Sequence, residues 1–260
     1  YMWIFICKTS KSWIQGFKPR SNSFLFSSSC WELKNFKTNY SGETDLKLVV
    51  KFGGTSLATV KDIKNVAKTV DKISKKNKTV VVCSAVDGIT DELIQISSLI
   101  EKGNKKDANR ILAKISQKHK QFADHLITNP KILKALQNKL NSDLSELEKL
   151  VQGLILLGEV TPRSYDYLIS FGERLSINLV SFSLQEMKNK SVPLSGKEAG
   201  IVTDSNFGDS RPLMDTTRIR LSKTINEYFT KNTIPVIAGF AGVDQHDHTT
   251  TFGRGGSDYT

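Results

Sequence analysis

A lysine followed by two glycines ends the first strand-like run of the chain. The apolar residues of 46–50 lead into the segment KFGGTS, in which Lys51 directly precedes the Phe-Gly-Gly turn at 52–54. Glycines lack the Cβ atoms that would keep a phosphate from the backbone, and a following helix turns its N–H groups toward an anion. The pattern predicts a phosphate-binding loop at residues 51–56. A tight strand-to-helix turn with an incidental lysine is the alternative.

A second glycine-rich segment, GRGGSD at residues 253–258, carries an arginine. Arginine can hold a carboxylate or a phosphate through two parallel hydrogen bonds. Two such loops, each with one cation, predict a site where two anions meet, unless both are chance turns. Neither segment matches the GxxxxGK[ST] loop of P-loop proteins or the GxGxxG fingerprint of dinucleotide-binding proteins and protein kinases.

The elements that must position these loops alternate along the chain. Strand-like runs lie at 46–50, 78–86, 191–196 and 233–243. Helical spacing covers 57–74, 90–100, 107–127, 132–157, 166–187 and 214–229, with the fourth of these interrupted or ended near Gly153 and Gly158. Alternating strands and helices predict an α/β protein, a three-layer αβα sandwich with a mainly parallel sheet, from about Leu46 onward.

Composition narrows the classes of function. The chain has 260 residues, 38% of them hydrophobic and 24% charged, with no apolar run close to the ~20 residues that span a bilayer. The net charge of +11 is spread without a long basic block, which favours a solvated surface over nucleic-acid or membrane binding. Cys7, Cys30 and Cys83 form no CxxC pair, which fits a reducing cytoplasm.

Residues 1–45 differ in composition from the rest. They are rich in Ser, Lys and aromatic residues and show no clear periodicity. An organelle transit peptide has this composition. The chain begins with Tyr1 and the folded pattern starts abruptly at Leu46, which favours a non-domain leader, such as an over-extended reading frame or a disordered extension. We therefore expect one domain at 46–260.

Five segments occur together in an informative order and spacing: KFGGTS, CSAVDGITDEL, TPRSYDYLISFGERLS, GIVTD and TTFGRGGSDYT. From Leu46 to Thr260 the chain resembles the amino-acid kinase superfamily and, within it, the aspartokinases, with wording most similar to archaeal-type members. The resemblance implies transfer of the γ-phosphoryl group of ATP, brought in with Mg²⁺, to the side-chain carboxylate of L-aspartate. It also implies a homo-oligomer for the full-length protein, and the first step of lysine, threonine and methionine biosynthesis.

The resemblance assigns roles to single residues. Lys51 matches the catalytic lysine, and Asp258 matches the carboxylate that orients it. Glu173 would pair with the α-ammonium group of aspartate, and Arg254 would bind its α-carboxylate. Hydroxyl donors around the substrate would be Ser84, Thr90 and Ser257. The residues around the phosphates would be Lys51, Phe52, Gly53, Gly54, Thr55, Ser56, Gly255 and Gly256. No general base is required, because an aspartate carboxylate with a pKa of about 3.9 is already ionised at neutral pH.

Structural roles are the alternatives for several of these residues. Glu173 could be a solvated helix residue, Ser84 an ordinary strand-end hydroxyl, and Thr90 a helix cap. Arg163 and Asp166 are expected to form a structural pair near the site. His246 and His248 could ligate a metal from one face of a strand, although a polar hairpin tip is favoured.

Two other functions stay open. One is a related kinase that acts on another carboxylate, such as glutamate or N-acetylglutamate. The other is a non-catalytic module that binds a nucleotide or an amino acid. The resemblance places the adenine pocket, a second phosphate-binding lysine and ACT-type regulatory modules beyond Thr260, so we expect this chain to be the N-terminal part of a catalytic domain. That leaves the activity of this piece by itself open.

Overall fold

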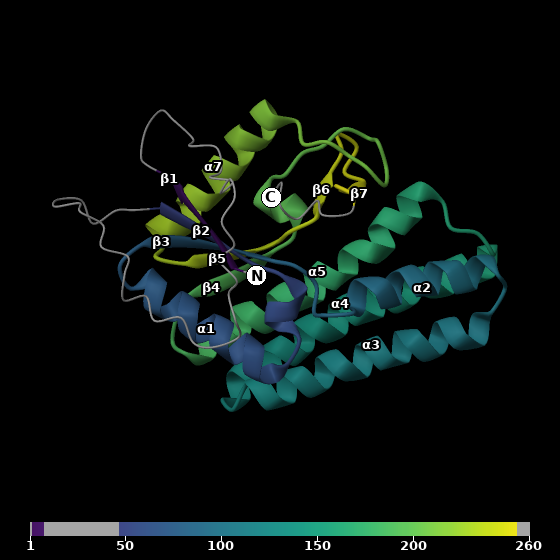
Figure 1. Ribbon diagram of the computed structural model, residues 1–260, viewed down its shortest axis with the longest axis horizontal. Helices are drawn as coiled ribbons and strands as arrows, with labels where there is room; N and C mark the ends of the chain where they lie inside the picture. Colours follow the sequence, from purple (N-terminus) through teal and green to yellow (C-terminus); the bar gives the residue numbers. More distant parts are fainter. Residues whose placement is uncertain (1, 8–46, 254–260) are drawn as a thin grey trace, which may run out of the picture.

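The computed structural model describes residues 2–7, as backbone only, and residues 47–253. Its main sheet has five strands in the order β1–β2–β3–β5–β4 (Figure 1). Strands β2 to β5 pair in parallel, whereas β1 pairs antiparallel with β2 at the edge. The bounds are β1 Met2–Cys7, β2 Lys47–Phe52, β3 Lys78–Cys83, β4 Ser191–Leu194 and β5 Ile234–Ala238. The prediction of a mainly parallel sheet is confirmed.

Helices cover both faces of this sheet, as the sandwich prediction requires (Figure 1). One face and the helices packed on it form the larger apolar core, and the opposite face packs against α7 in a smaller one. The helices of the larger layer are α1 Val60–Ser74, α2 Ile89–Glu101, α3 Lys105–Leu126, α4 Pro130–Leu157 and α5 Pro162–Glu186. On the other side lie α7 Met214–Thr230 and the short α6 Gly196–Ala199.

Local sequence signals set the helix ends. Thr161 caps α5 by accepting a hydrogen bond from the N–H of Ser164, and Pro162 occupies the first turn, where its fixed φ suits a helix. Helix α4 ends at Leu157 because Gly158 adopts the left-handed conformation that closes a helix. The predicted interruption at Gly153 is wrong: α4 continues through it, and one glycine costs a helix only about 1 kcal/mol.

The last predicted strand, 233–243, is divided in the structure. Strand β5 ends at Ala238, and β6 Ala241–Val243 pairs antiparallel with β7 Thr249–Thr251 in a separate two-stranded sheet. Residues 244–248 form the turn between β6 and β7, so the predicted polar hairpin tip is confirmed. The chain bends at Phe240, whose φ of 102° lies in the left-handed region that a bulky residue rarely adopts.

Strand β1 comes from the segment that the sequence pattern marks as a leader. Its six residues pair with the whole length of β2, from Met2 opposite Phe52 to Cys7 opposite Lys47. The pattern of residues 1–45 does not predict this strand. The assignment of residues 1–45 as a non-domain leader stays a prediction.

None of the helices in residues 47–253 combines the length and the apolar character that crossing a membrane requires.

Candidate active site

A cavity of about 440 Å³ opens where three parallel strands end. Its lining includes Gly54, which follows β2, the residues 84–88 that follow β3, and Phe240, which follows β5. Backbone hydrogen bonds join these ends: the N–H of Ser84 donates to the carbonyl oxygen of Phe52, and the N–H of Gly239 to that of Cys83. Ligands of open α/β sheets bind at this carboxyl edge.

The structure gathers several predicted residues around this cavity. Gly54, Ser84, Thr90 and Glu173 all line it, although they are far apart in the sequence. Lys51 and Phe52 are buried at the end of β2, and the rest of the predicted phosphate loop, Gly53, Thr55 and Ser56, follows them into a short 3-10 helix at Gly54–Leu57. Five predicted residues lie outside the described part of the chain: Arg254, Gly255, Gly256, Ser257 and Asp258.

The glycine turn after β2 packs tightly against the loop after β3. A Cβ atom placed on Gly54 would lie 3.2 Å from the carbonyl oxygen of Ala85, closer than side chains normally approach. A larger residue at position 54 would therefore push the two loops apart. This close approach gives a structural reason for glycine at a position that the sequence assigned to phosphate binding.

Glu173 is the most unusual side chain in the cavity. It is 4% exposed, and one carboxylate oxygen accepts a hydrogen bond of 3.2 Å from the N–H of Ala85. Its other oxygen, Oε2, is buried without a hydrogen-bond partner among the described residues. Burial raises the pKa of Glu173 from its ordinary 4.5 to about 8, and the backbone hydrogen bonds offset only part of this effect. The alternative of a solvated helix residue is wrong.

Helix α5 brings Glu173 to the cavity through close contact with the loop after β3. A Cβ atom on Gly172 would lie 2.8 Å from the Cβ atom of Ala85, so only glycine allows this approach. The hydroxyl of Ser176 donates a hydrogen bond of 2.7 Å to the carbonyl oxygen of Ser84. The segment SFGERLS thus holds the loop at 84–85 against the carboxylate.

Two structural alternatives for site residues are corrected. Thr90 does not cap α2: the helix begins at Ile89 after Gly88, which adopts a left-handed conformation and makes no side-chain cap hydrogen bond. The structural pair of Arg163 and Asp166 is not formed. Arg163 is exposed and approaches His248, with 3.4 Å between Nη1 and Nε2, whereas Asp166 is buried and binds backbone groups.

Phe240 and Tyr165 are among the residues that line the cavity but were not predicted from the sequence. Phe240 holds a strained backbone conformation there, and such outliers gather at functional sites. Tyr165 comes from the first turn of α5. Phe240 could have been predicted from its position. It lies two residues after the apolar parallel strand β5, at the same sheet edge as Gly54 and Ser84.

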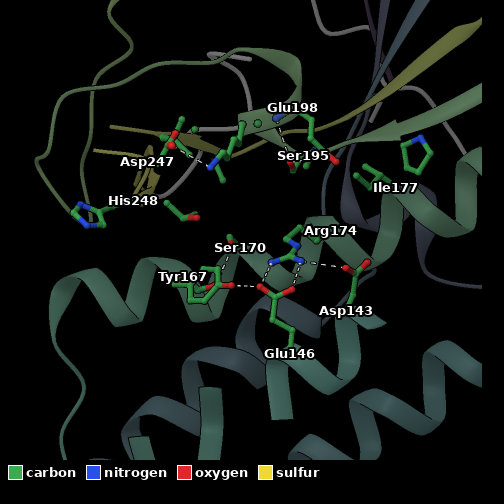
Figure 2. A pocket seen from close by; sticks show the side chains of 18 of the residues that line it. Asp143, Glu146, Tyr167, Ser170, Arg174, Ile177, Ser195, Glu198, Asp247 and His248 are labelled. Carbon is green, nitrogen blue, oxygen red and sulfur yellow. Dashed lines mark hydrogen bonds and ion pairs between the residues drawn. The ribbon is translucent and has the colours of Figure 1, made fainter. Parts of the chain in front are cut away.

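A larger cleft of about 920 Å³ is lined by none of the predicted site residues that the structure describes. Its wall from α4 and α5 is a paired charge cluster of Arg174, Asp143, Glu146 and Tyr167 (Figure 2). Nη2 of Arg174 lies 2.7 Å from Glu146 Oε2 and 3.1 Å from Asp143 Oδ1. The smaller cavity is the candidate site, because four predicted residues converge there and a buried carboxylate oxygen lacks a hydrogen-bond partner among the described residues.

His246 and His248 lie at the β6–β7 turn, and His248 lines the larger cleft. Their ring centroids are 6.0 Å apart, and His248 Nδ1 lies 3.2 Å from Asp244 Oδ2. Within residues 47–253 no three His, Cys, Asp or Glu side chains gather as a group that could hold a metal ion. Asp244 instead accepts hydrogen bonds from the N–H groups of His246 and His248, which fixes the turn.

The family model described as "Amino acid kinase family" matches residues 47–260, and the chain belongs to this family. It is similar to aspartokinase 3, chloroplastic, of Arabidopsis thaliana, at 31% identity over 87% of this chain and 40% of that protein. It is also similar to the aspartokinase of Geobacillus stearothermophilus, at 32% identity over 82% of this chain and 38% of the relative. The chain thus spans about 40% of the length of these curated relatives.

Solved structures of Escherichia coli aspartokinase III have the same fold. One, in complex with lysine and aspartate, superimposes with a TM-score of 0.71 at 25% identity, covering 81% of this chain and 44% of that one. Another, in complex with aspartate and ADP, gives a TM-score of 0.68 at 26% identity, covering 84% and 45%. These likenesses agree with the three-layer architecture.

Proposed function

We propose that the protein containing this chain is an aspartate kinase, which transfers the γ-phosphoryl group of ATP to the side-chain carboxylate of L-aspartate. The observation that carries the proposal is the buried carboxylate of Glu173, which lines a cavity at the sheet edge and has one oxygen without a hydrogen-bond partner among residues 47–253. The cavity of about 440 Å³ lies in the size range of small-molecule sites. Aspartate and ADP occupy the related E. coli enzyme, which supports this choice.

Glu173 and Arg254 divide the recognition of the amino acid in this proposal. A buried carboxylate without a full set of partners gains most from a cation, and the α-ammonium group of aspartate supplies one. Arg254 binds the α-carboxylate through its planar guanidinium group. The side-chain carboxylate then points to the phosphoryl donor as an ionised nucleophile, so no side chain has to remove a proton.

Lys51 acts on the phosphoryl side of the site. Its β2 position, next to the glycine turn, suits a cation that offsets charge on the transferring group. Gly53 and Gly54 let phosphate oxygens approach the backbone, and Asp258 orients the lysine. A Mg²⁺ ion bound with ATP adds positive charge at the phosphates; the described residues offer no cluster of three ligands, so phosphate oxygens would hold most of it.

Hydroxamate trapping of the acyl phosphate tests this proposal in the full-length protein. We expect ATP-dependent aspartyl hydroxamate, with glutamate and N-acetylaspartate each at least about tenfold poorer in kcat/KM. N-acetylaspartate is the informative control, because an acylated substrate has no ammonium group for Glu173. Equal rates with glutamate, or better rates with the acylated compound, would assign the site to another carboxylate kinase. Nucleotide binding without any acyl phosphate would instead indicate a non-catalytic module.

Two properties of the full-length protein stay expectations from the resemblance. They are assembly into a homo-oligomer and a cytoplasmic location.

A further inference from the structure

Asp166 is a buried carboxylate on α5 that joins three segments of the chain. Oδ2 accepts hydrogen bonds from the N–H of Gly208 at 3.0 Å and from the N–H of Thr251 at 2.9 Å. Oδ1 accepts a third from the hydroxyl of Thr251 at 2.7 Å. The side chain is fully buried, so all three bonds are shielded from water. Helix α5, the loop at 204–210 and strand β7 are therefore joined at one residue.

The same face of α5 holds two loops of the site. Asp166 lies seven residues before Glu173, about two helical turns, which places both carboxylates on one face. Glu173 accepts the N–H of Ala85 from the loop after β3. Asp166 accepts the N–H of Thr251, two residues before the glycine at which the second glycine-rich segment begins.

The loop at 204–210 packs closely against Gly253, the first residue of the second glycine-rich segment. Gly253 has a φ of 72°, and a Cβ atom there would lie 3.0 Å from Asp209 Oδ1 and 3.3 Å from the carbonyl oxygen of Gly208. Glycine is needed for both the conformation and the space. Asp166 binds both Gly208 and Thr251. It therefore holds the loop at 204–210 against the segment that runs from Thr251 to Gly253.

We propose that Asp166 is a positioning residue that sets the distance between Glu173 and Gly253, the residue that directly precedes Arg254 in the sequence. This inference rests on the proposed function, in which the side chains of Glu173 and Arg254 bind the α-ammonium and α-carboxylate groups of one amino acid. Those groups are joined to a single carbon atom, so their partners must keep a fixed spacing. Anchoring both loops to one face of one helix provides that spacing, and Asp166 does so without touching the substrate.

The role depends on accepting hydrogen bonds rather than on charge. The three donors are two peptide N–H groups and a hydroxyl, and Asp166 forms no ion pair with any residue in 47–253. Asparagine can reproduce the pattern, because its oxygen can accept both N–H groups while its amide donates to the threonine hydroxyl. Alanine leaves all three donors buried and unpaired.

Steady-state kinetics of the full-length protein separates this role from a purely structural one. For Asp166→Ala we expect KM for aspartate to rise by roughly tenfold to a hundredfold, because small misplacements of binding groups cost this much. The values of KM for ATP and kcat stay within about threefold. Asp166→Asn restores KM for aspartate to within about threefold of the wild-type value.

Asp244→Ala is the matched control. Asp244 is also buried and also accepts backbone N–H groups, those of His246 and His248, together with the hydroxyl of Ser205; its hydrogen bonds hold the far end of the same hairpin and the start of the loop at 204–210 rather than Thr251. Both alanine variants lower the melting temperature, and only Asp166→Ala changes KM for aspartate. Equal KM values in the two variants would overturn the proposal, as would an asparagine variant as defective as alanine.

Amide hydrogen exchange decides the inference independently of catalysis. Asp166→Ala should speed exchange in residues 250–253 by at least about tenfold, whereas Asp244→Ala should not, because local opening follows the loss of anchoring bonds. If the wild-type protein does not use aspartate, the proposed function fails, and this exchange pattern still supports or refutes the anchoring role. If Asp166→Ala does not fold, Thr251→Val removes only the hydroxyl bond; exchange in residues 250–253 should rise by about threefold, and no change would refute the anchoring role.

Discussion

Glu173 and Arg174 are neighbours on α5 that line two different cavities. They differ in whether their charged groups have partners. The carboxylate of Glu173 is buried, with one oxygen lacking a hydrogen-bond partner among residues 47–253, and its pKa is raised by burial. The guanidinium group of Arg174 is paired: it binds Glu146 and Asp143, and its central carbon lies 4.3 Å from the ring centroid of Phe171. In return, its hydrogen bond holds the pKa of Glu146 below the ordinary value.

The contrast separates a buried group without a charge partner among the described residues from one that has partners. Burying such a carboxylate costs stability, which fits the proposed role of Glu173 in binding a cationic group of a ligand. The paired charge cluster instead joins α4 to α5. The larger cleft in Figure 2 is therefore the less informative one about function.

Removal of Arg174 should give the largest effect on stability. Arg174→Met leaves Asp143, which is 3% exposed at its side chain, with Lys139 as its remaining ion partner among residues 47–253. We expect unfolding by urea to show a loss of about 3 kcal/mol, the usual result of breaking a buried pair. KM for aspartate should stay within about twofold, because Arg174 lines the larger cleft and not the smaller cavity proposed to bind aspartate.

Lys75→Met is the control for this variant. It removes an exposed ion pair with Asp71 on α1, at 2.7 Å, and should cost less than about 0.5 kcal/mol. A strong rise in KM for aspartate in Arg174→Met would contradict the separation of the two regions.

Replacement of Lys51 should give the largest effect on catalysis. Lys51→Met should lower kcat of the full-length protein by about 100-fold or more, as expected when one preorganised electrostatic contact is lost. Lys139→Met is the control, because Lys139 pairs with Asp143 of the paired charge cluster, at 3.3 Å. This variant should leave kcat within about threefold of the wild-type value. A Lys51→Met enzyme with near-normal kcat would show that the phosphoryl charge is stabilised elsewhere.

The raised pKa of Glu173 gives a smaller, pH-dependent effect on stability. The folded state favours its protonated form, so the free energy of unfolding should fall as pH rises from about 4.5, the ordinary pKa, through about 8, the folded value. The slope from this one group is at most about 1.4 kcal/mol per pH unit. Glu173→Gln cannot ionise, so its stability should exceed that of the wild type increasingly across this range. Parallel curves from urea unfolding at several pH values would refute the shift.

Much of this site could be predicted because its signals are local. The apolar strand before Lys51, the Thr161–Pro162 helix start and the Gly158 helix stop act over a few residues, and the structure has each of them. The sequence motifs shared with the family predicted one common site for Gly54, Ser84, Thr90 and Glu173. All four residues line the same cavity in the structure.

The remainder depends on contacts between distant segments. The pairing of Asp166 with Gly208 and Thr251 spans 42 and 85 residues, and no spacing rule within α5 reveals it. The strain at Phe240 arises because the chain leaves the main sheet and enters the β6–β7 hairpin there. Strand β1 is likewise defined only by its pairing with β2.

Kinetics with aspartate and with succinate, which is aspartate without its ammonium group, tests the central claim about Glu173 most directly. In the full-length protein, Glu173→Ala should lower kcat/KM for aspartate on the order of 100-fold, mainly through KM, because a buried charge partner of the ammonium group is lost. The same variant should leave kcat/KM for succinate within about threefold, so the preference for aspartate over succinate collapses. If Glu173→Ala lowers both values equally, Glu173 does not bind the ammonium group and the account is contradicted.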